Sequence, residues 1–245
     1  MILKKTPIFP FLSILIFLTI SCLSGCKESS YEFGELSRLA GDTTDKGPIG
    51  HGFTDIYERF FYPLKYAPIK IFEIGIAEGA SLSLWEKYFP HATVYGIDIF
   101  DRSDLNSKRI KTFVADQAKR NQLMRFIRKY GNAYDIILDD GGHSMPQQQI
   151  SFGFLFKFVK PGGYYIIEDL HTSLPQFFPS FHVEEGGADS TLRMINHLLE
   201  TRKIESKYLT IEEKNYLQRN IEYVVLFGRN ISLPSITCII KKKKE

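Results

Sequence analysis

The chain has 245 residues, of which 44% are hydrophobic and 24% charged, a balance that suits one globular α/β domain and excludes a disordered chain. The formal net charge of +3 resides at the ends, in Lys4, Lys5 and the four lysines of residues 241–244. Removing these six positive charges leaves −3 on the rest, which excludes the basic surface that a nucleic-acid-binding protein requires.

The first 26 residues have the layout of a targeting segment. Two lysines precede an apolar run from about Ile8 to Leu23, which is short for a membrane span and contains Pro10. The LSGC sequence that ends at Cys26 resembles the lipobox of bacterial lipoproteins, in which this cysteine carries the lipid. An uncleaved membrane anchor is the alternative interpretation.

Three regions follow from this layout. We expect residues 1–26 to be a signal, lipoprotein leader or membrane anchor, residues 27–240 to form the domain, and residues 241–245 to be a solvated basic tail. The protein is then membrane-associated, with Cys26 as the candidate lipid anchor. The sequence leaves open whether the domain faces the cytoplasm or is exported.

Runs typical of strands alternate with runs typical of helices over the rest of the chain. Short apolar runs predict seven strands, at about residues 69–75, 92–98, 110–116, 134–140, 163–169, 221–227 and 235–240. Helical spacing predicts helices at about residues 54–66, 80–89, 117–130, 146–159 and 188–202. This order predicts an α/β fold with a Rossmann-like, doubly wound, mostly parallel seven-stranded sheet whose last strand is antiparallel. Cys238 lies in the last run and is expected to be a buried strand residue.

A glycine loop follows the first of these strands and opens a helix. Gly75 and Gly79 allow a tight turn, but their spacing is not the GxGxxG of dinucleotide binders, and no P-loop lysine follows. Such a loop suits an amino-acid headgroup and a ribose, and Asp98, 19 residues after Gly79, is placed to accept ribose hydroxyls. The pattern resembles motif I of the class I S-adenosylmethionine (SAM)-dependent methyltransferases. The alternative is that the glycines only form a turn and that Asp98 caps a helix.

Consecutive acids end two later strands. Asp140, Glu168 and Asp169 are expected to converge at one edge of the sheet, where ligands of open α/β folds bind. Three adjacent carboxylates resist ionisation unless a cation neutralises them, and an all-oxygen set favours Mg²⁺. His143 follows two glycines and is a candidate to take a proton from a hydroxyl. The alternatives are capping acids and a polar turn histidine, and His171 is an equally close histidine.

The runs IILDDGGHSMPQQ and KPGGYYIIEDLHTS, with TDKG and HGFTDIY upstream, resemble the metal-dependent macrolide-sugar O-methyltransferases of the mycinamicin VI 2''-O-methyltransferase type. That family is also similar to cephalosporin hydroxylase-like proteins, and the likeness covers about residues 35–200. The resemblance implies Mg²⁺ binding by Asp140, Glu168 and Asp169, and proton acceptance by His143. The expected SAM contacts are Glu73, Gly75, Gly79, Ser81, Asp98, Asp116, Gln117 and Asp139.

The expected function is therefore SAM- and Mg²⁺-dependent O-methylation of a hydroxyl on a sugar or sugar-like diol, with a small molecule or glycan as acceptor. Residues 172–190, rich in phenylalanine, are expected to be a lid or acceptor loop, with an ordinary surface loop as the alternative. One rival is a non-catalytic surface lipoprotein that retains the fold. Another is an oxidative hydroxylase. Its iron site would need two histidines and one carboxylate, whereas the predicted cluster has three carboxylates. The acceptor and the oligomeric state are not predicted.

Overall fold

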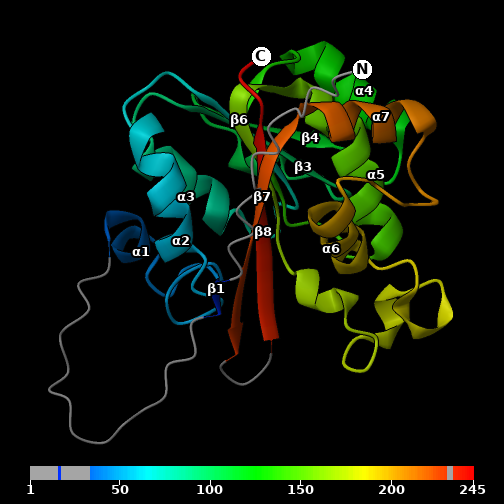
Figure 1. The fold of residues 1–245 in the computed structure, drawn as a ribbon. Helices are drawn as coiled ribbons and strands as arrows, with labels where there is room; N and C mark the ends of the chain where they lie inside the picture. Colours follow the sequence, from blue (N-terminus) through cyan, green and yellow to red (C-terminus); the bar gives the residue numbers. More distant parts are fainter. Residues whose placement is uncertain (1–15, 18–33, 231–233) are drawn as a thin grey trace, which may run out of the picture.

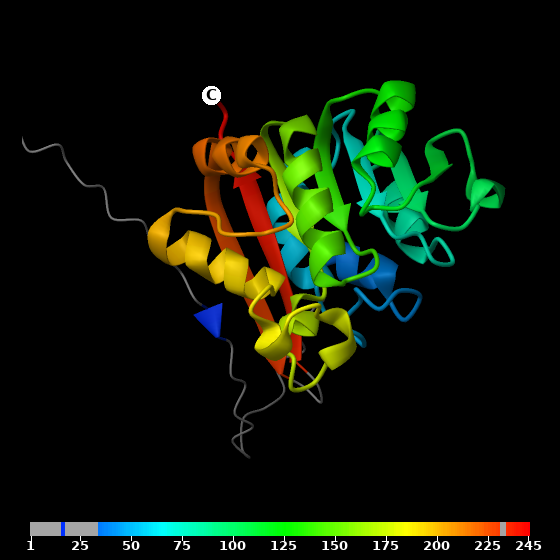
Figure 2. The same cartoon turned by 90° about the vertical axis from the view of Figure 1, so that its right-hand side faces the viewer.

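The computed structural model describes residues 16–17, 34–230 and 234–245, which form one mixed sheet with helices on both faces (Figures 1 and 2). Within this part of the chain the sheet has eight strands in the order β1-β7-β8-β6-β5-β2-β3-β4. Their bounds are β1 Ile16–Phe17, β2 Lys70–Ile74, β3 Thr93–Asp98, β4 Ile110–Val114, β5 Tyr134–Asp139, β6 Val159–Ile167, β7 Ile221–Asn230 and β8 Pro234–Lys242.

The strand directions agree with the predicted topology. Strand β8 is antiparallel to both of its neighbours, β6 and β7, whereas the other paired strands are parallel. The seven predicted strands are therefore confirmed, with the last one antiparallel, and the two-residue β1 adds a short edge beside β7.

The helices divide between the two faces of the sheet (Figure 1). One face carries α1 Glu35–Ala40, α2 Thr54–Phe61 and α3 Ala80–Tyr88, and the other carries α4 Arg120–Tyr130, α5 Met145–Leu155, α6 Thr191–Thr201 and α7 Ile211–Asn220. The five predicted helices are present, but the sequence patterns did not predict α1 and α7. Helix α7 did have a local signal, because Thr210 and Glu213 form a capping box at its start.

Alternate residues of each central strand enter different cores, as burial on both faces requires. In β5, Ile136 and Leu138 pack under α1–α3, whereas Ile137 packs under α4–α7. Phe72 of β2 stacks on Phe126 of α4, with 4.3 Å between the ring centroids. Each buried side chain of this size contributes about 1.5–3 kcal/mol of transfer free energy, so the two cores hold the strand ends in fixed positions.

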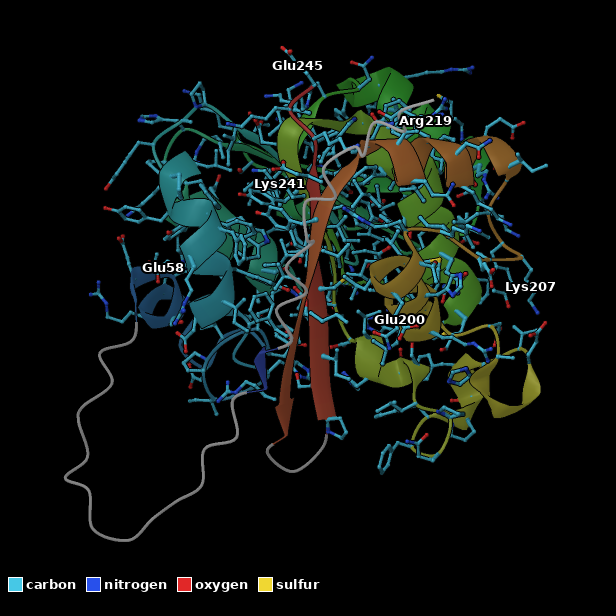
Figure 3. The ribbon with its side chains drawn as sticks, in the orientation of Figure 1. Glu58, Glu200, Lys207, Arg219, Lys241 and Glu245 are labelled. Carbon is cyan, nitrogen blue, oxygen red and sulfur yellow. The ribbon has the colours of Figure 1, made fainter. Side chains whose placement is uncertain are left out.

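The end of the chain differs from the expected solvated tail at Lys241 and Lys242, because β8 continues through both residues. The buried Lys242 donates to the carbonyl oxygens of Phe156, Lys157 and Val159, at 3.4, 3.0 and 2.6 Å. Lys241 lies over the Tyr164 ring, with Nζ 3.9 Å from the centroid, beside β8 in Figure 3. A buried lysine whose ammonium donates to several carbonyl oxygens is satisfied, so Lys242 belongs to the fold, and Lys241 joins it through β8 and the Tyr164 ring.

The predicted leader, residues 1–26, lies outside the described residues except for Ile16–Phe17 of β1. Its cleavage, its lipid attachment and the location of the protein stay predictions. Among the helices of the described part, none combines the length and the apolar character that a membrane crossing needs.

Cys238 is expected to resist alkylation in the native protein. Its side chain is fully buried in β8, as predicted, and burial raises the pKa of the thiol to about 12. Because the thiolate is the nucleophile, iodoacetamide at pH 8 should leave Cys238 unmodified until urea unfolds the domain. Mass spectrometry of the peptide that contains Cys238 measures the label, and rapid labelling without urea would contradict the burial.

Candidate functional site

A cavity of about 550 Å³ opens at the carboxyl ends of β2, β3 and β5. Its lining comes from residues of the segments 43–46, 74–81, 97–102 and 140–142, with Ala115, Gln117 and Gln147. Five predicted site residues are in this lining: Gly75, Ser81, Asp98, Gln117 and Asp140. The volume is within the range of sites for small ligands and cofactors, so a cavity lies at the edge of the sheet where the cofactor is predicted to bind.

The glycine loop, residues 75–79, forms the turn from β2 into α3. Gly75 has a φ of 86° and Gly79 a φ of 82°, a region that L side chains rarely adopt. A Cβ at Gly75 would lie 2.1 Å from the carbonyl oxygen of Asp140. Glycine at position 75 therefore allows the ends of β2 and β5 to approach closely.

Asp98 shapes the glycine loop from the end of β3. Its Oδ2 accepts hydrogen bonds from the backbone N–H groups of Ile76, at 2.9 Å, and Ala77, at 3.2 Å. Its Oδ1 accepts from the N–H of Phe100, at 3.0 Å. A carboxylate has about four acceptor positions, so Asp98 can hold the loop and still accept from a hydroxyl in the cavity.

Asp139 lies behind the cavity rather than in its lining. Its oxygens accept from Gln117 Nε2, at 2.9 Å, from the Tyr165 hydroxyl, at 3.1 Å, and from the Ser151 hydroxyl. Burial raises the pKa of Asp139 to about 6, although the hydrogen bonds to its carboxylate act to lower the pKa. Gln117 in turn accepts from the N–H of Gly142, at 2.7 Å. Asp139 thus orients Gln117, which does line the cavity.

Glu73 and Asp116 are also outside the cavity lining. Glu73 is fully buried, accepts from Trp85 Nε1 at 2.9 Å, and has its pKa raised to about 7 by burial. Asp116 accepts from the N–H of Ala118, at 2.8 Å, in the turn before α4. The structure gives both carboxylates structural partners, and their predicted SAM contacts stay predictions.

Asp140, His143 and Asp169 form an acid–histidine cluster beside the cavity. One potential ligand atom from each of the three lies within 4.8 Å of the others, and His143 Nε2 is 3.4 Å from Asp169 Oδ2. Asp169 Oδ1 and His143 Nδ1 are buried without a hydrogen-bond partner. His143 and Asp169 have φ values of 57° and 53°, a strained region that clusters at functional sites. The donor set fits a divalent cation.

Glu168 does not share this cluster. Its Oε1 accepts from the Tyr57 hydroxyl at 2.9 Å, and its Oε2 accepts from Lys46 Nζ at 3.1 Å. The side chain is buried, and burial raises its pKa well above the usual range. The structure therefore brings together two of the three predicted metal ligands, Asp140 and Asp169, and places the predicted proton acceptor His143 beside them.

Sequence reasoning named His171 as an alternative to His143 but missed the other residues around Asp169 and Glu168, which are Lys46, His51 and Tyr57. His51 Nε2 and His171 Nδ1 each lie 3.8 Å from Asp169 Oδ1, so three imidazoles face one carboxylate when His143 is included. Burial lowers the pKa of His171, although the negative charge of Asp169 acts to raise the pKa. The TDKG and HGFTDIY runs contain Lys46, His51 and Tyr57, but nothing local in those runs assigns them a role.

Residues 172–190 lie against the histidines, in short 3₁₀ helices drawn in yellow-green and yellow in Figure 2. The Phe178 ring packs edge-on to His171, with centroids 5.2 Å apart, and the Phe181 ring is 6.5 Å from that of His143. The carboxylate of Asp189 accepts from the Tyr208 hydroxyl at 2.5 Å. The segment is thus tied to the domain and reaches the cluster with two aromatic rings, while its role as a lid or acceptor loop stays a prediction.

A doubly wound sheet with an antiparallel last strand, a glycine loop after β2 and an acidic edge at β5 and β6 is the architecture of the SAM-dependent methyltransferase fold. In sequence and structure the chain is similar to macrolide-sugar O-methyltransferases, and the resemblance predicted from the sequence is confirmed.

Two curated O-methyltransferases show this similarity in sequence. Mycinamicin VI 2''-O-methyltransferase of Micromonospora griseorubida is 36% identical over 170 residues, which are 66% of this chain and 41% of that protein. The 8-demethyl-8-(2-methoxy-alpha-L-rhamnosyl)-tetracenomycin-C 3'-O-methyltransferase of Streptomyces olivaceus is 38% identical over 148 residues, 57% of this chain and 38% of that protein. The match thus spans about two fifths of these relatives' own length. No protein-family profile matches the chain.

Solved methyltransferase structures show the same similarity in fold. The MycE methyltransferase of the mycinamycin pathway, in complex with Mg and S-adenosylhomocysteine (SAH), has a TM-score of 0.68 and 30% identity, over 86% of this chain and 55% of that one. An O-methyltransferase from Bacillus cereus in complex with SAH has a TM-score of 0.54 at 12% identity, which shows a common fold alone.

Proposed function

We propose that the protein is a SAM- and Mg²⁺-dependent O-methyltransferase that acts on a hydroxyl of a sugar or sugar-like diol. The observation that carries this proposal is the cluster of Asp140, His143 and Asp169 beside the cavity that begins at the glycine loop. The names of the relatives support the acceptor class, since they methylate sugar hydroxyls of macrolides and of rhamnosyl tetracenomycins. The surface lipoprotein and the hydroxylase find no support in these relatives.

The cavity fits SAM, which supplies an electrophilic methyl group when bound. Gly75 lines the cavity, Gly79 has the positive φ of the turn into α3, and Asp98 can accept from ribose hydroxyls. The exposed side chains of Ile99 and Phe100 offer apolar area at the cavity edge.

The acid–histidine cluster fits Mg²⁺, since Asp140 and Asp169 offer hard oxygen ligands and Asp169 Oδ1 has no protein donor. A divalent cation supplies positive charge that favours the deprotonated form of a nearby hydroxyl. His143 Nε2 faces both carboxylates and is placed to receive the hydroxyl proton. Asp169 Oδ2, 3.4 Å from His143 Nε2, would then stabilise the imidazolium.

On the sequence alone, we also propose that residues 1–26 place the protein at a membrane through lipid at Cys26.

The test of the proposed reaction is transfer of a labelled methyl group from SAM to glycosides that carry adjacent sugar hydroxyls, with the full-length protein in mild detergent. We expect product in Mg²⁺, a loss of about a hundredfold or more in EDTA, and recovery when Mg²⁺ is restored. A glycoside that lacks the second hydroxyl is the matched acceptor control. Undiminished transfer in EDTA would rule out the metal role, and failure to bind SAM in calorimetry would rule out the reaction class.

A further inference from the structure

Two members of the acid–histidine cluster depend on their backbone for direction. His143 and Asp169 both have positive φ values, 57° and 53°, which residues other than glycine rarely adopt. His143 Nδ1 and Asp169 Oδ1 are buried without a hydrogen-bond partner, so no hydrogen bond at these atoms fixes either side chain. The 3.4 Å between His143 Nε2 and Asp169 Oδ2 therefore depends on how firmly the two backbone segments are held together.

The hydroxyl of Thr172 lies between these two segments. Its Oγ1 is 2.8 Å from the carbonyl oxygen of Asp169 and 3.1 Å from the carbonyl oxygen of His143. A threonine hydroxyl has one proton to donate, so the two carbonyl oxygens share it. The bond to Asp169 is the usual local bond of a threonine to the carbonyl three residues earlier, but the bond to His143 spans 29 positions. Thr172 thus ties the two cluster residues to each other through their backbones.

The chain around Thr172 holds it in place. Thr172 belongs to the 3₁₀ helix Leu170–Ser173, which begins directly after Asp169, and it is 3% exposed. Its N–H donates to the Asp169 carbonyl oxygen at 3.0 Å, and its own carbonyl oxygen accepts from Nε2 of the buried His182, also at 3.0 Å. Because Thr172 is buried in this way, its hydroxyl has little access to water as an alternative partner.

We propose that Thr172 is a positioning residue of the proposed reaction, because its hydroxyl holds the backbones of His143 and Asp169 together so that the imidazole and the carboxylate face each other. Without the hydroxyl, both carbonyl oxygens lose a donor, and two strained residues are free to relax. A misplacement of about 1 Å at a reacting group can slow a reaction by about a hundredfold. The inference rests on the proposed function.

The first test needs no bound ligand. It compares amide hydrogen–deuterium exchange of the full-length protein with that of Thr172→Val, which has nearly the same shape but no hydroxyl. Exchange should become at least about threefold faster in both tied segments, residues 140–144 and 169–173, because opening either segment no longer breaks the bond. Thr172→Ser, which restores the hydroxyl, should exchange like the unmodified protein. Unchanged exchange of residues 140–144 in Thr172→Val would overturn the proposal.

Two further measurements on the same variants test the effect on the proposed reaction. In paramagnetic resonance titrations, Thr172→Val should bind Mn²⁺ about tenfold more weakly, and its single-turnover methyl transfer at saturating SAM should be about ten- to a hundredfold slower. Thr172→Ser should recover most of both losses. Unchanged Mn²⁺ affinity and rate in Thr172→Val would rule out the positioning role. If the unmodified protein neither binds Mn²⁺ nor transfers the methyl group, the proposed function fails, and the exchange measurement alone decides whether Thr172 holds the two segments.

Thr112→Val is the matched control. The Thr112 side chain is also buried, and its hydroxyl also donates to a backbone carbonyl, that of Arg102 at 3.0 Å, but it contacts neither cluster residue. The control should leave the Mn²⁺ affinity and the exchange of residues 140–144 unchanged. Equal losses in the two valine variants would show that the position of the hydroxyl does not matter, against the proposal. If Thr172→Val does not fold, Thr172→Ala, which places no methyl group beside the carbonyl oxygens, takes its place with the same expected results.

Discussion

Replacing His143 with alanine is expected to lower kcat by about 10²–10⁴-fold and to leave SAM affinity unchanged. His143 Nε2 lies 3.4 Å from Asp169 Oδ2 and 4.0 Å from Asp140 Oδ1, where the acceptor hydroxyl would be held. His143 is not among the residues that line the cofactor cavity, so its removal should spare SAM binding. Single-turnover methyl transfer measures the rate, and calorimetric titration measures SAM binding.

His171→Ala separates the two histidines that the sequence left as alternatives. His171 is more deeply buried than His143 and packs against Phe178, so its loss should change acceptor KM or stability more than the chemical step. His197→Ala, in α6 and paired with Glu205, is a control outside the site. A larger fall in single-turnover rate for His171→Ala than for His143→Ala would reassign the proton acceptor.

Replacing Gly75 with alanine is expected to abolish measurable SAM binding and to destabilise the domain by about 2–5 kcal/mol. The added Cβ would lie 2.1 Å from the Asp140 carbonyl oxygen and 2.9 Å from the Gly141 Cα. Both neighbours are backbone atoms, so β2 and β5 would have to separate at the edge where the cavity opens. Urea unfolding and calorimetric titration measure the two effects.

Gly186→Ala is the matched control for this substitution. Gly186 also has a positive φ, of 66°, but no heavy atom lies within 4 Å of the position a Cβ would take. Alanine there brings only the backbone strain of the left-handed region, about 1–2 kcal/mol. Equal losses of SAM affinity in the two variants would show that the close approach at Gly75 does not matter for binding.

The alternation of apolar runs was enough to predict the sheet, because parallel strands buried on both faces leave a strong pattern. It was also enough to place Asp140 near Asp169, since β5 and β6 are neighbours with Asp139 paired to Ile167. Helix α1 was missed because its single short amphipathic turn resembles a loop.

The orientation of consecutive acids was harder to predict. Successive residues of a strand point to opposite faces, but only Asp139 belongs to a strand, whereas Asp140, Glu168 and Asp169 follow the strand ends, where no such alternation fixes their direction. Asp139 turns toward Tyr165 and Ser151, while Asp140 faces Lys46. The contact between Lys46 and Asp140 was beyond sequence reasoning, because the two residues are 94 positions apart and no local spacing indicates it.

The last strand reaches back to the first part of the site. His51 Nδ1 lies 2.7 Å from the Ser235 hydroxyl, and the Tyr57 hydroxyl lies 3.1 Å from that of Thr237, contacts that join residues 184 and 180 positions apart. These contacts cannot form before β8 has left the ribosome and inserted between β6 and β7. During synthesis, His51 and Tyr57 therefore gain these partners only when the end of the chain is in place, and this part of the site is completed last.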